Sequence, residues 1–335
     1  MKKIAINGFG RIGRLFLRAA FKNPVFFKNH EVVAVNDLTD SATLGHLLKY
    51  DSVHGIFPEQ VTASEKMIFA GGHEIQVLSE KEPFKLPWKD MGVDLVVEST
   101  GFFTKSGAEG HLQAGAKKVI LSAPGTCQAT LVMGVNDDTY DKAKHNVVSM
   151  ASCTTNCLAP IAYILEKEFG IDKAFMSTAH SYTNDQKLLD FPHKDLRRAR
   201  NAATNIIPTS TGAAKAIGEV IPSLKGKMDG IALRVPTPDG SINNVVAVLN
   251  RPASKEEVNA VMKEYADGKK GRMKGILKYE TDPIVLTDIV GNPHSSIFDS
   301  QLTNCMGNLC STFSWYDNEW GFSMRLVECT QMMLK

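Results

Sequence analysis

The sequence predicts an α/β protein of two domains. A doubly wound parallel sheet is expected first, followed by an α+β domain with a large, mostly antiparallel sheet. One observation is a glycine motif from Gly8 to Gly13, between a short apolar strand and a helix. A second is a series of β-like runs that continues to about residue 150. The third is that later strand-like runs follow one another with few helices between them.

Composition is that of an ordinary globular protein. Of 335 residues, 43% are hydrophobic, and the formal net charge is +2, which gives no strong attraction to nucleic acid. No apolar run approaches the roughly 20 residues that a membrane helix needs. The N-terminus lacks a signal-peptide core, and six irregularly spaced cysteines predict no disulfide framework. We therefore expect a reducing compartment, the cytoplasm.

The first element is a strand from Lys2 to Asn7, followed at once by the glycine motif and a helix over Arg14 to Phe21. Gly8 permits a tight turn, Gly10 lets the backbone approach a pyrophosphate, and Gly13 allows close helix–strand packing. The helix N-terminus would face the anion. This is the Rossmann-type arrangement for a dinucleotide, although glycines also mark turns that bind nothing.

A second strand, Glu31 to Asn36, ends at Asp37. A carboxylate there accepts hydrogen bonds from the adenosine ribose 2′-OH and repels a 2′-phosphate, which favours NAD over NADP. The alternative is a turn residue after a strand. Because the glycine motif is in register with Asp37, we favour the cofactor interpretation.

Four more strands are expected at Val93 to Val97, Lys118 to Leu121, Leu131 to Val135 and Asn146 to Ser149. Ser122 follows the second of these. Ligands of open parallel sheets bind beyond the carboxyl ends of strands, so Ser122 is a candidate contact on the nicotinamide side. A structural loop serine is the alternative.

Cys153 lies between Ser152 and Thr154, ahead of an apolar helical run from Leu158 to Phe169. A cysteine at a helix N-terminus is expected to favour the thiolate, and the neighbouring hydroxyl and N–H groups could hold an anion. An inert buried cysteine is the alternative. His180, after a strand from Lys173 to Thr178, is a candidate base, although a histidine there is often structural.

The remaining sequence offers further anion-binding groups. The basic stretch from Phe191 to Ala203 is a solvated loop or a flap over an anionic ligand or a subunit neighbour. A hydroxyl-rich turn from Pro208 to Gly212 opens a helix, and Arg234 ends a strand. Strands are expected at 241–249, 275–279 and 309–315, and helices at 253–266 and 321–333. Cys153 with Cys157, and Cys305 with Cys310, lack matched ligand pairs, so no metal site is predicted.

Eight segments in this order resemble the phosphorylating glyceraldehyde-3-phosphate dehydrogenase family along nearly the whole chain. They are INGFGRIGR (6–14), LLKYDSVHG (47–55), ASCTTNCLAP (151–160), YTNDQ (182–186), HKDLRRAR (193–200), IPTSTGAAKA (207–216), RVPTPDGS (234–241) and SWYDNEWG (314–321). The resemblance implies an NAD-binding domain over residues 1–151, to which a C-terminal helix at about 318–335 returns. It also implies a catalytic domain over 152–317 and a homotetramer.

The resemblance also implies site residues. Cys153 is similar to the family's nucleophile and His180 to its base. The implied NAD contacts are Gly8, Gly10, Arg11, Ile12, Gly13, Asp37, Lys81, Ser122 and Asn318, with Lys81 standing where the family commonly has Arg. Ser152, Thr154, Thr211 and Gly212 match one phosphate site, and Thr183, Arg198 and Arg234 match the other. Asp37 with Pro192 is similar to the NAD-preferring pattern. Met150 and Phe322 replace the family's frequent Asn and Tyr, with a modest effect on rate expected.

The implied reaction is oxidation of glyceraldehyde 3-phosphate with NAD and inorganic phosphate to 1,3-bisphosphoglycerate, in glycolysis or gluconeogenesis. It runs through a cysteine hemithioacetal and a thioester. Erythrose-4-phosphate dehydrogenase is the nearest alternative, but the run from Thr211 to Lys215 is not expected in it. A binding protein for NAD or RNA that keeps only the fold is a second alternative, which Cys153, His180 and Arg234 oppose. No membrane and no primary nucleic-acid partner are expected.

Overall fold

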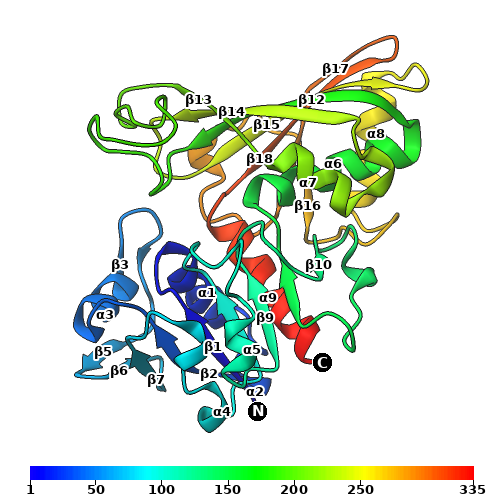
Figure 1. Ribbon diagram of the computed structural model, residues 1–335. Coiled ribbons are helices and arrows are strands. Elements are labelled where there is room, and N and C mark those ends of the chain that lie inside the picture. Colours follow the sequence, from blue (N-terminus) through cyan, green and yellow to red (C-terminus); the bar gives the residue numbers. More distant parts are fainter. The chain divides into compact units, whose positions relative to one another are not determined.

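The computed structural model describes residues 1–335 and divides into two compact units (Figure 1). The first comprises Met1–Leu131, Tyr140–Ala151 and Ser323–Lys335, and the second comprises Val132–Thr139 and Ser152–Phe322. One chain boundary between the units therefore falls between Ala151 and Ser152. No helix combines the length and apolar character that a bilayer crossing requires.

The first unit is built on a nine-stranded sheet in the order β10-β11-β9-β8-β1-β2-β7-β6-β5. Seven strands are parallel: β1 (Lys2–Asn7), β2 (His30–Asn36), β7 (His73–Leu78), β8 (Leu95–Glu98), β9 (Lys118–Leu121), β10 (Ala129–Thr130) and β11 (Val147–Ser149). The edge strands β5 (Val61–Ser64) and β6 (Met67–Ala70) are antiparallel, and β3 (Tyr50–Asp51) pairs separately with β4 (Gly55–Ile56). Because β2 and β8 lie on opposite sides of β1, the carboxyl end of β1 is a topological switch point, where such sheets bind ligands.

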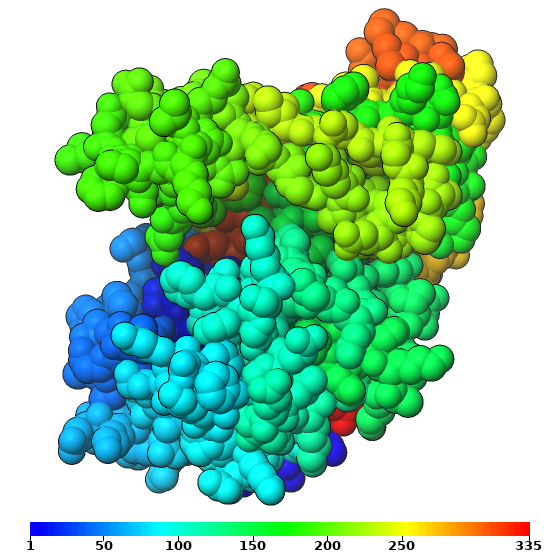
Figure 2. All heavy atoms as spheres, viewed as in Figure 1, coloured from blue at the N-terminus to red at the C-terminus, as the bar shows by residue number.

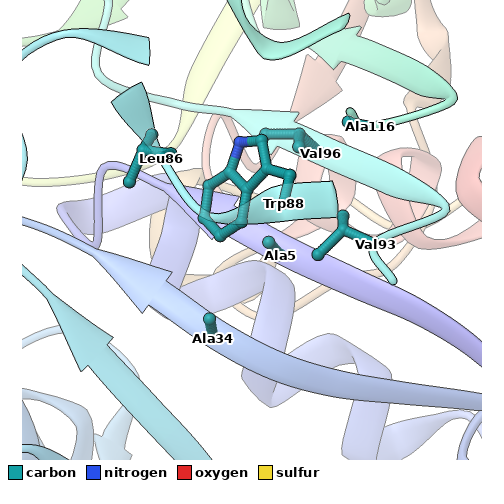
Figure 3. Close-up of a cluster of buried hydrophobic side chains, with 7 residues drawn as sticks. All are labelled: Ala5, Ala34, Leu86, Trp88, Val93, Val96 and Ala116. Atoms are coloured by element: carbon teal, nitrogen blue, oxygen red, sulfur yellow. The ribbon is translucent and has the colours of Figure 1, made fainter. Parts of the chain in front are cut away.

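Helices and a tryptophan-centred core complete this unit. The helical elements are α1 (Arg11–Lys22), α2 (Phe26–Asn29), α3 (Ser41–Lys49), η1 (Pro83–Lys85), α4 (Trp88–Met91), α5 (Gly110–Gln113) and most of α9 (Trp320–Leu334). Trp88 is fully buried, and its indole packs in one cluster with six aliphatic side chains (Figure 3), those of Ala5, Ala34, Leu86, Val93, Val96 and Ala116. This core includes side chains of β1, β2 and β8, the three strands that meet at the switch point.

The strands expected at Lys2 to Asn7 and Lys118 to Leu121 are confirmed, but the one expected at Leu131 to Val135 is wrong. The strand β10 ends at Thr130, and the following residues turn into η2 (Asp137–Thr139). The Asn136 side chain accepts a hydrogen bond from the Val132 N–H, and Asp137 accepts one from Gly134. Such side-chain bonds to nearby backbone compete with a strand ladder despite the apolar sequence.

The second unit has a seven-stranded sheet in the order β13-β14-β12-β15-β18-β17-β16. Its strands are β12 (Ile171–Ser181), β13 (Ile207–Ser210), β14 (Met228–Val235), β15 (Ser241–Leu249), β16 (Leu277–Glu280), β17 (Ser296–Met306) and β18 (Leu309–Tyr316). The pairs β12–β14 and β16–β17 are parallel, and the other four are antiparallel. The mostly antiparallel sheet is therefore confirmed.

Helices cover one face of this second sheet and leave the other open (Figure 1). They are α6 (Cys153–Phe169), α7 (Ala213–Val220) and α8 (Lys255–Ala266), with the short turns η3 (Pro222–Leu224) and η4 (Leu286–Asp288). Side chains along β12 alternate between buried and exposed. On the open face, Phe175 is 69% exposed and Ile231 is 43% exposed. The loops between β12 and β13 form one end of this unit (Figures 1 and 2).

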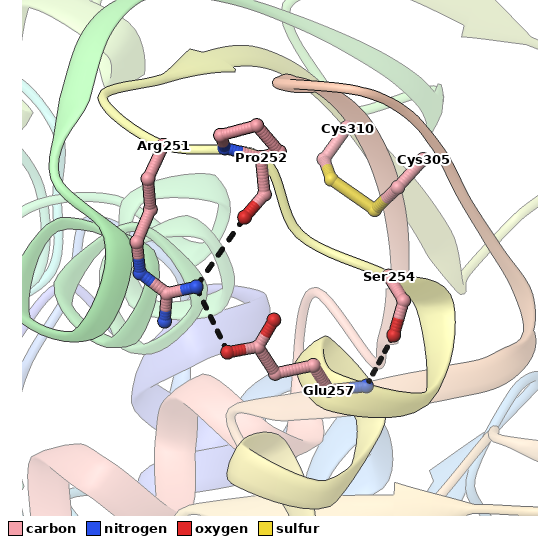
Figure 4. The surroundings of a disulfide bond; sticks show 6 residues. All are labelled: Arg251, Pro252, Ser254, Glu257, Cys305 and Cys310. Atoms are coloured by element: carbon pink, nitrogen blue, oxygen red, sulfur yellow. Dashed lines mark hydrogen bonds and ion pairs between the residues drawn. A yellow bond between two sulfur atoms is a disulfide. The ribbon is translucent and has the colours of Figure 1, made fainter.

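A single disulfide joins Cys305 and Cys310 (Figure 4), a pair that the sequence did not predict. The two residues lie directly opposite each other on the antiparallel strands β17 and β18, with 4.1 Å between their Cα atoms. Hairpin pairing therefore brings them within disulfide reach. The spacing of cysteines along the chain does not reveal this, because it depends on strand register. Cys127, Cys153, Cys157 and Cys329 are free.

Candidate active site

Cys153 is the first residue of α6, as the sequence predicts. Ser152 is the N-cap: it has extended backbone, and its Oγ accepts a hydrogen bond from the Thr155 N–H at 3.1 Å. Ala151 just before it has a φ of 54°, the only non-glycine residue in the chain with positive φ. This left-handed residue turns the chain from β11 into the helix at a cost of about 1 kcal/mol. The helix start and Cys153 are thereby fixed in place.

His180 is the partner of Cys153. It lies near the end of β12, and its Nε2 is 3.4 Å from the Cys153 Sγ. Its Nδ1 lies 2.7 Å from the carbonyl oxygen of Ser181. A proton on Nδ1, donated to that carbonyl, leaves the lone pair of Nε2 facing the sulfur. This is the tautomer that a general base requires.

Arg234 completes this group from the neighbouring strand. It pairs with His180 in the parallel register of β12 and β14. Its Nη1 donates to the Ser181 carbonyl at 3.0 Å and lies 2.6 Å from His180 Nδ1. Because a guanidinium only donates, this second contact favours an unprotonated Nδ1, whereas the Ser181 carbonyl favours the Nδ1 proton of the base tautomer. Sheet pairing thus brings together a thiol, an imidazole and a guanidinium that lie 27 and 54 residues apart in the chain.

The expectation that the helix start lowers the thiol pKa is wrong for this arrangement. Burial raises the pKa of the Cys153 thiol, and the opposing effects of the Arg234 charge and of Thr154 are smaller. The side chain is partly exposed, but packed atoms surround its sulfur. Burial, reinforced by Arg234, lowers the pKa of His180 to about 3. Both groups are therefore neutral at pH 7.

Tyr316 contacts residues on the buried side of the site. It was not singled out by the sequence. Its hydroxyl lies 3.0 Å from Thr154 Oγ1 and 2.9 Å from Thr178 Oγ1, and its ring stands edge-on to His180. Tyr316 thus ties the first turn of α6 to β12. Its place at the buried end of an alternating strand was the only sequence signal available for it.

The implied phosphate-binding residues also lie in this unit. Ser152 Oγ accepts the Thr155 N–H and also lies 2.8 Å from Thr155 Oγ1, a contact in which either hydroxyl can donate. Gly212 is the N-cap of α7 and has no side-chain cap, which leaves N–H groups at that helix start for an anion. Thr211 Oγ1 accepts a hydrogen bond from the Ala213 N–H at 3.2 Å.

Thr183 and Arg198 are each held by nearby polar groups. Thr183 is bonded to Gln186 through both its N–H and its hydroxyl, at 2.8 and 3.1 Å. Arg198 donates to Thr209 Oγ1 at 2.6 Å and pairs with Asp185. Asp185 and Arg198 lie within electrostatic range of Arg234. The two arginines and Asp185 therefore form one charged cluster, of which Asp185 is a member that sequence reasoning missed.

In the first unit, the glycine motif forms the predicted turn at the carboxyl end of β1. Gly8 has a φ of +89°, and a Cβ there would lie 2.6 Å from the Thr100 nitrogen. A Cβ on Gly13 would lie 2.2 Å from the Gly8 oxygen. Gly10, the N-cap of α1, has no side-chain cap and no atom within 4 Å of a Cβ built on it. Open N–H groups at a helix start beside a glycine turn fit a dinucleotide pyrophosphate.

Asp37 is brought to this turn: its Oδ2 accepts the Phe9 N–H at 2.8 Å. Arg11 and Ile12 begin α1, and Arg11 Nη1 pairs with Asp51 at 2.6 Å. The other implied cofactor residues are more dispersed. Lys81 lies exposed in the loop after β7, and Ser122 directly follows β9. Asn318 belongs to the second unit, where its Oδ1 accepts from Ser241 at 2.8 Å.

The departures from the family pattern differ in environment. Met150 is fully buried, and Phe322 is 4% exposed, so both are packing residues. Phe191 is exposed, with the Lys187 ammonium over its ring.

Comparison with known proteins identifies the family of the chain. Residues 2–106 match the family model "Glyceraldehyde 3-phosphate dehydrogenase, NAD binding domain", and residues 152–318 match the model of its C-terminal domain. The glyceraldehyde-3-phosphate dehydrogenase of Mycobacterium avium is 57% identical, covering 99% of this chain and 98% of that protein. That of Mycobacterium tuberculosis is 56% identical over 99% and 98%, and glyceraldehyde-3-phosphate dehydrogenase 2 of Streptomyces avermitilis is 54% identical over 98% and 97%. The chain belongs to the glyceraldehyde-3-phosphate dehydrogenase family.

Proposed function

We propose that the chain oxidises glyceraldehyde 3-phosphate with NAD and inorganic phosphate to 1,3-bisphosphoglycerate. The observation that carries this proposal is the 3.4 Å approach of Cys153 Sγ to His180 Nε2, with Arg234 beside them. The named relatives, more than half identical over nearly the whole chain, support the same activity.

In the first step, Cys153 Sγ bonds to the aldehyde carbon and passes its proton through His180 to the carbonyl oxygen, which gives a hemithioacetal. His180 then takes the hydroxyl proton while the substrate loses a hydride and becomes a thioester. NAD, when bound, supplies the hydride acceptor. A phosphate oxygen finally attacks the thioester carbon, and the C–S bond breaks to release Cys153.

Two anion sites serve these steps. We assign one to Ser152, Thr154, Thr211 and Gly212, and the other to Thr183, Arg198 and Arg234. The place of Ser152 and Thr154 at the start of α6 and the uncapped start of α7 support the first assignment. The charged cluster of Arg198, Arg234 and Asp185 supports the second.

The cofactor contacts are assigned to Gly8, Gly10, Arg11, Ile12, Gly13, Asp37, Lys81, Ser122 and Asn318. We divide the chain into an NAD-binding domain over residues 1–151, with the helix from about 318 to 335, and a catalytic domain over 152–317. The unit boundary between Ala151 and Ser152, and the grouping of Ser323–Lys335 with the first unit, support this division.

A direct assay tests the activity. Purified chain should form NADH from glyceraldehyde 3-phosphate and NAD, and the rate should depend on inorganic phosphate. Erythrose 4-phosphate serves as the comparison substrate and should react more slowly. Negligible NADH formation with glyceraldehyde 3-phosphate and phosphate, or faster turnover of erythrose 4-phosphate, would contradict the proposal.

We further propose a homotetramer. The open face of the second sheet carries Phe175 and Ile231, and the loop between β12 and β13 exposes Leu188, Leu189 and Leu196 by 72% or more. Exposed apolar side chains gathered in this way are typical of subunit contacts. Light scattering should give four times the mass of the 36.7 kDa chain, and Ile231→Glu should reduce it. A monomeric unmodified chain would contradict this assignment.

The proposed location is the cytoplasm, the compartment of a glycolytic activity. Four of the six cysteines are free, which fits a reducing environment. Fractionation of the source cells, followed by the NADH assay on each fraction, tests this location.

A further inference from the structure

A buried polar network lies beneath the glycine turn of the first unit and has no part in the chemistry described above. It joins three neighbouring parallel strands and two short helices. Its members are Asn36 on β2, Asn7 on β1, Glu98 on β8, Trp88 on α4 and His111 on α5. All five side chains are buried. Polar groups so far from water require a complete set of hydrogen bonds.

The hydrogen bonds of this network have a defined direction. The Trp88 indole N–H, which can only donate, donates to His111 Nδ1 at 3.0 Å. The proton of His111 is therefore on Nε2, which lies 3.1 Å from Glu98 Oε2. The Asn7 amide donates to the same oxygen at 2.6 Å. Asn36 in turn donates to Asn7 Oδ1 at 2.6 Å.

The other oxygen of Glu98 binds the loop after β8. Oε1 accepts the Thr100 N–H at 2.8 Å and the Thr100 hydroxyl at 2.5 Å. Four donors thus converge on one carboxylate, two on each oxygen. Both oxygens are filled, so removing one acceptor leaves a buried donor without a partner.

The network touches the glycine turn on two sides. Asn7 directly precedes Gly8, and Thr100 packs so closely against Gly8 that a Cβ built there would lie 2.6 Å from the Thr100 nitrogen. Ser99, next to Thr100, donates its hydroxyl to the Gly8 carbonyl at 2.6 Å. The position of Gly8 is therefore set by Asn7 and Thr100, and both are held by Glu98.

We propose that Glu98, oriented by His111, is a positioning residue for the cofactor, and that it sets the place of the Gly8 turn without touching NAD. This inference rests on the proposed NAD-dependent function. In Glu98→Gln, one oxygen becomes an NH₂ donor. Either Thr100 or the pair of Asn7 and His111 then faces a donor instead of an acceptor. The turn must shift to relieve this contact.

The test is calorimetric binding of NAD, ADP-ribose and adenosine to the full-length chain. Glu98→Gln should lower the affinity for NAD and for ADP-ribose by about tenfold, because both ligands carry the pyrophosphate. Adenosine affinity should stay the same, and so should kcat at saturating NAD. The matched control is Glu109→Gln, the same exchange at an exposed glutamate two residues from His111, which should change nothing.

A second pair of variants covers the case in which Glu98→Gln fails to fold. His111→Gln keeps an N–H donor toward Glu98, whereas His111→Leu removes it. The leucine variant should lose NAD affinity and the glutamine variant should retain most of it. Unchanged NAD affinity in folded Glu98→Gln or in His111→Leu overturns the proposal, as does an equal loss of adenosine affinity. If the unmodified chain binds no NAD, the proposed function fails first.

Discussion

At the scale of single residues, burial sets the protonation states of three neighbouring side chains in the candidate active site. His180 is buried and Cys153 and Arg234 are partly buried, and burial is the largest influence on the pKa of each. Burial keeps the thiol protonated and the imidazole neutral at pH 7. In the proposed reaction, proton transfer to His180 is therefore part of the attack on the aldehyde, rather than a step completed beforehand.

Replacing His180 tests this dependence. His180→Asn leaves a polar side chain of similar reach but no basic nitrogen opposite Cys153 Sγ. We expect thioester formation in a single turnover to slow by about a hundredfold or more. Stopped-flow measurement of the NADH burst gives this rate. An unchanged burst rate would exclude His180 as the base.

The same variant has a predicted effect on acid stability. The pKa of His180 is about 3 in the folded chain, because of burial and Arg234, against an ordinary value of 6.5. Between these values the unfolded chain binds more protons, so the free energy of unfolding falls as the pH falls. At pH 5 this loss is about 2 kcal/mol relative to neutral pH. His180→Asn should remove it, measured as the difference in denaturant midpoint between pH 7.5 and pH 5. An unchanged difference would contradict a buried neutral His180.

At the scale of elements, the start of α6 combines a helix cap with an anion site. Ser152 caps the helix by accepting the Thr155 N–H, and Cys153 follows as its first residue. Tyr316 ties the same turn to β12 through Thr154 and Thr178. The cap bond and the 2.8 Å contact with Thr155 Oγ1 hold the Ser152 side chain at the proposed anion site.

Two matched cap variants separate these roles. Ser152→Ala and Ser254→Ala each remove an N-cap whose Oγ accepts an N–H at 3.1 Å, the second at the start of α8. Each should cost about 1 kcal/mol of stability. Only Ser152→Ala should also raise the KM for phosphate, by about tenfold. Equal phosphate KM values in the two variants would show that Ser152 is a cap alone.

The number of titratable thiols tests whether the disulfide is present in solution. Cys305 and Cys310 are joined across β17 and β18, and the other four cysteines are free. In denaturant without reductant, a chromogenic thiol reagent should therefore titrate four groups. After reduction it should titrate all six. Six groups without reductant would show that the pair is open in solution.

Periodicity and turn chemistry predicted most elements, because local sequence determines them. The strand at Lys118 to Leu121 and the helix after Cys153 are such cases. The failures depend on side-chain hydrogen bonds, strand register and burial, which periodicity does not describe. Asn136 and Asp137 turn an apolar run away from the sheet, strand register joins Cys305 to Cys310, and burial raises the thiol pKa against the effect of the helix start. The residue types of Cys153 and His180 suggested a nucleophile and its base, but Tyr316 and Asp185 became visible only through packing.

At the scale of the whole molecule, the residues proposed for cofactor binding and those proposed for thiol chemistry lie mostly in different units. The first contains the glycine turn with the network that supports it, and the second contains Cys153, His180 and the charged cluster. Each group is held by hydrogen bonds within its own unit. Substitutions in one unit should therefore affect cofactor affinity and thiol chemistry separately.

The indole of Trp88 gives this division a spectroscopic consequence. Trp88 lies in the first unit, while Trp315 and Trp320 lie in the second. A chain in which Trp315 and Trp320 are replaced by Phe would emit from Trp88 alone. Because that indole is fully buried and bonded to His111, its emission should shift to the red only when the first unit opens. Comparing that shift with the loss of NADH formation would reveal whether the units unfold together or one after the other.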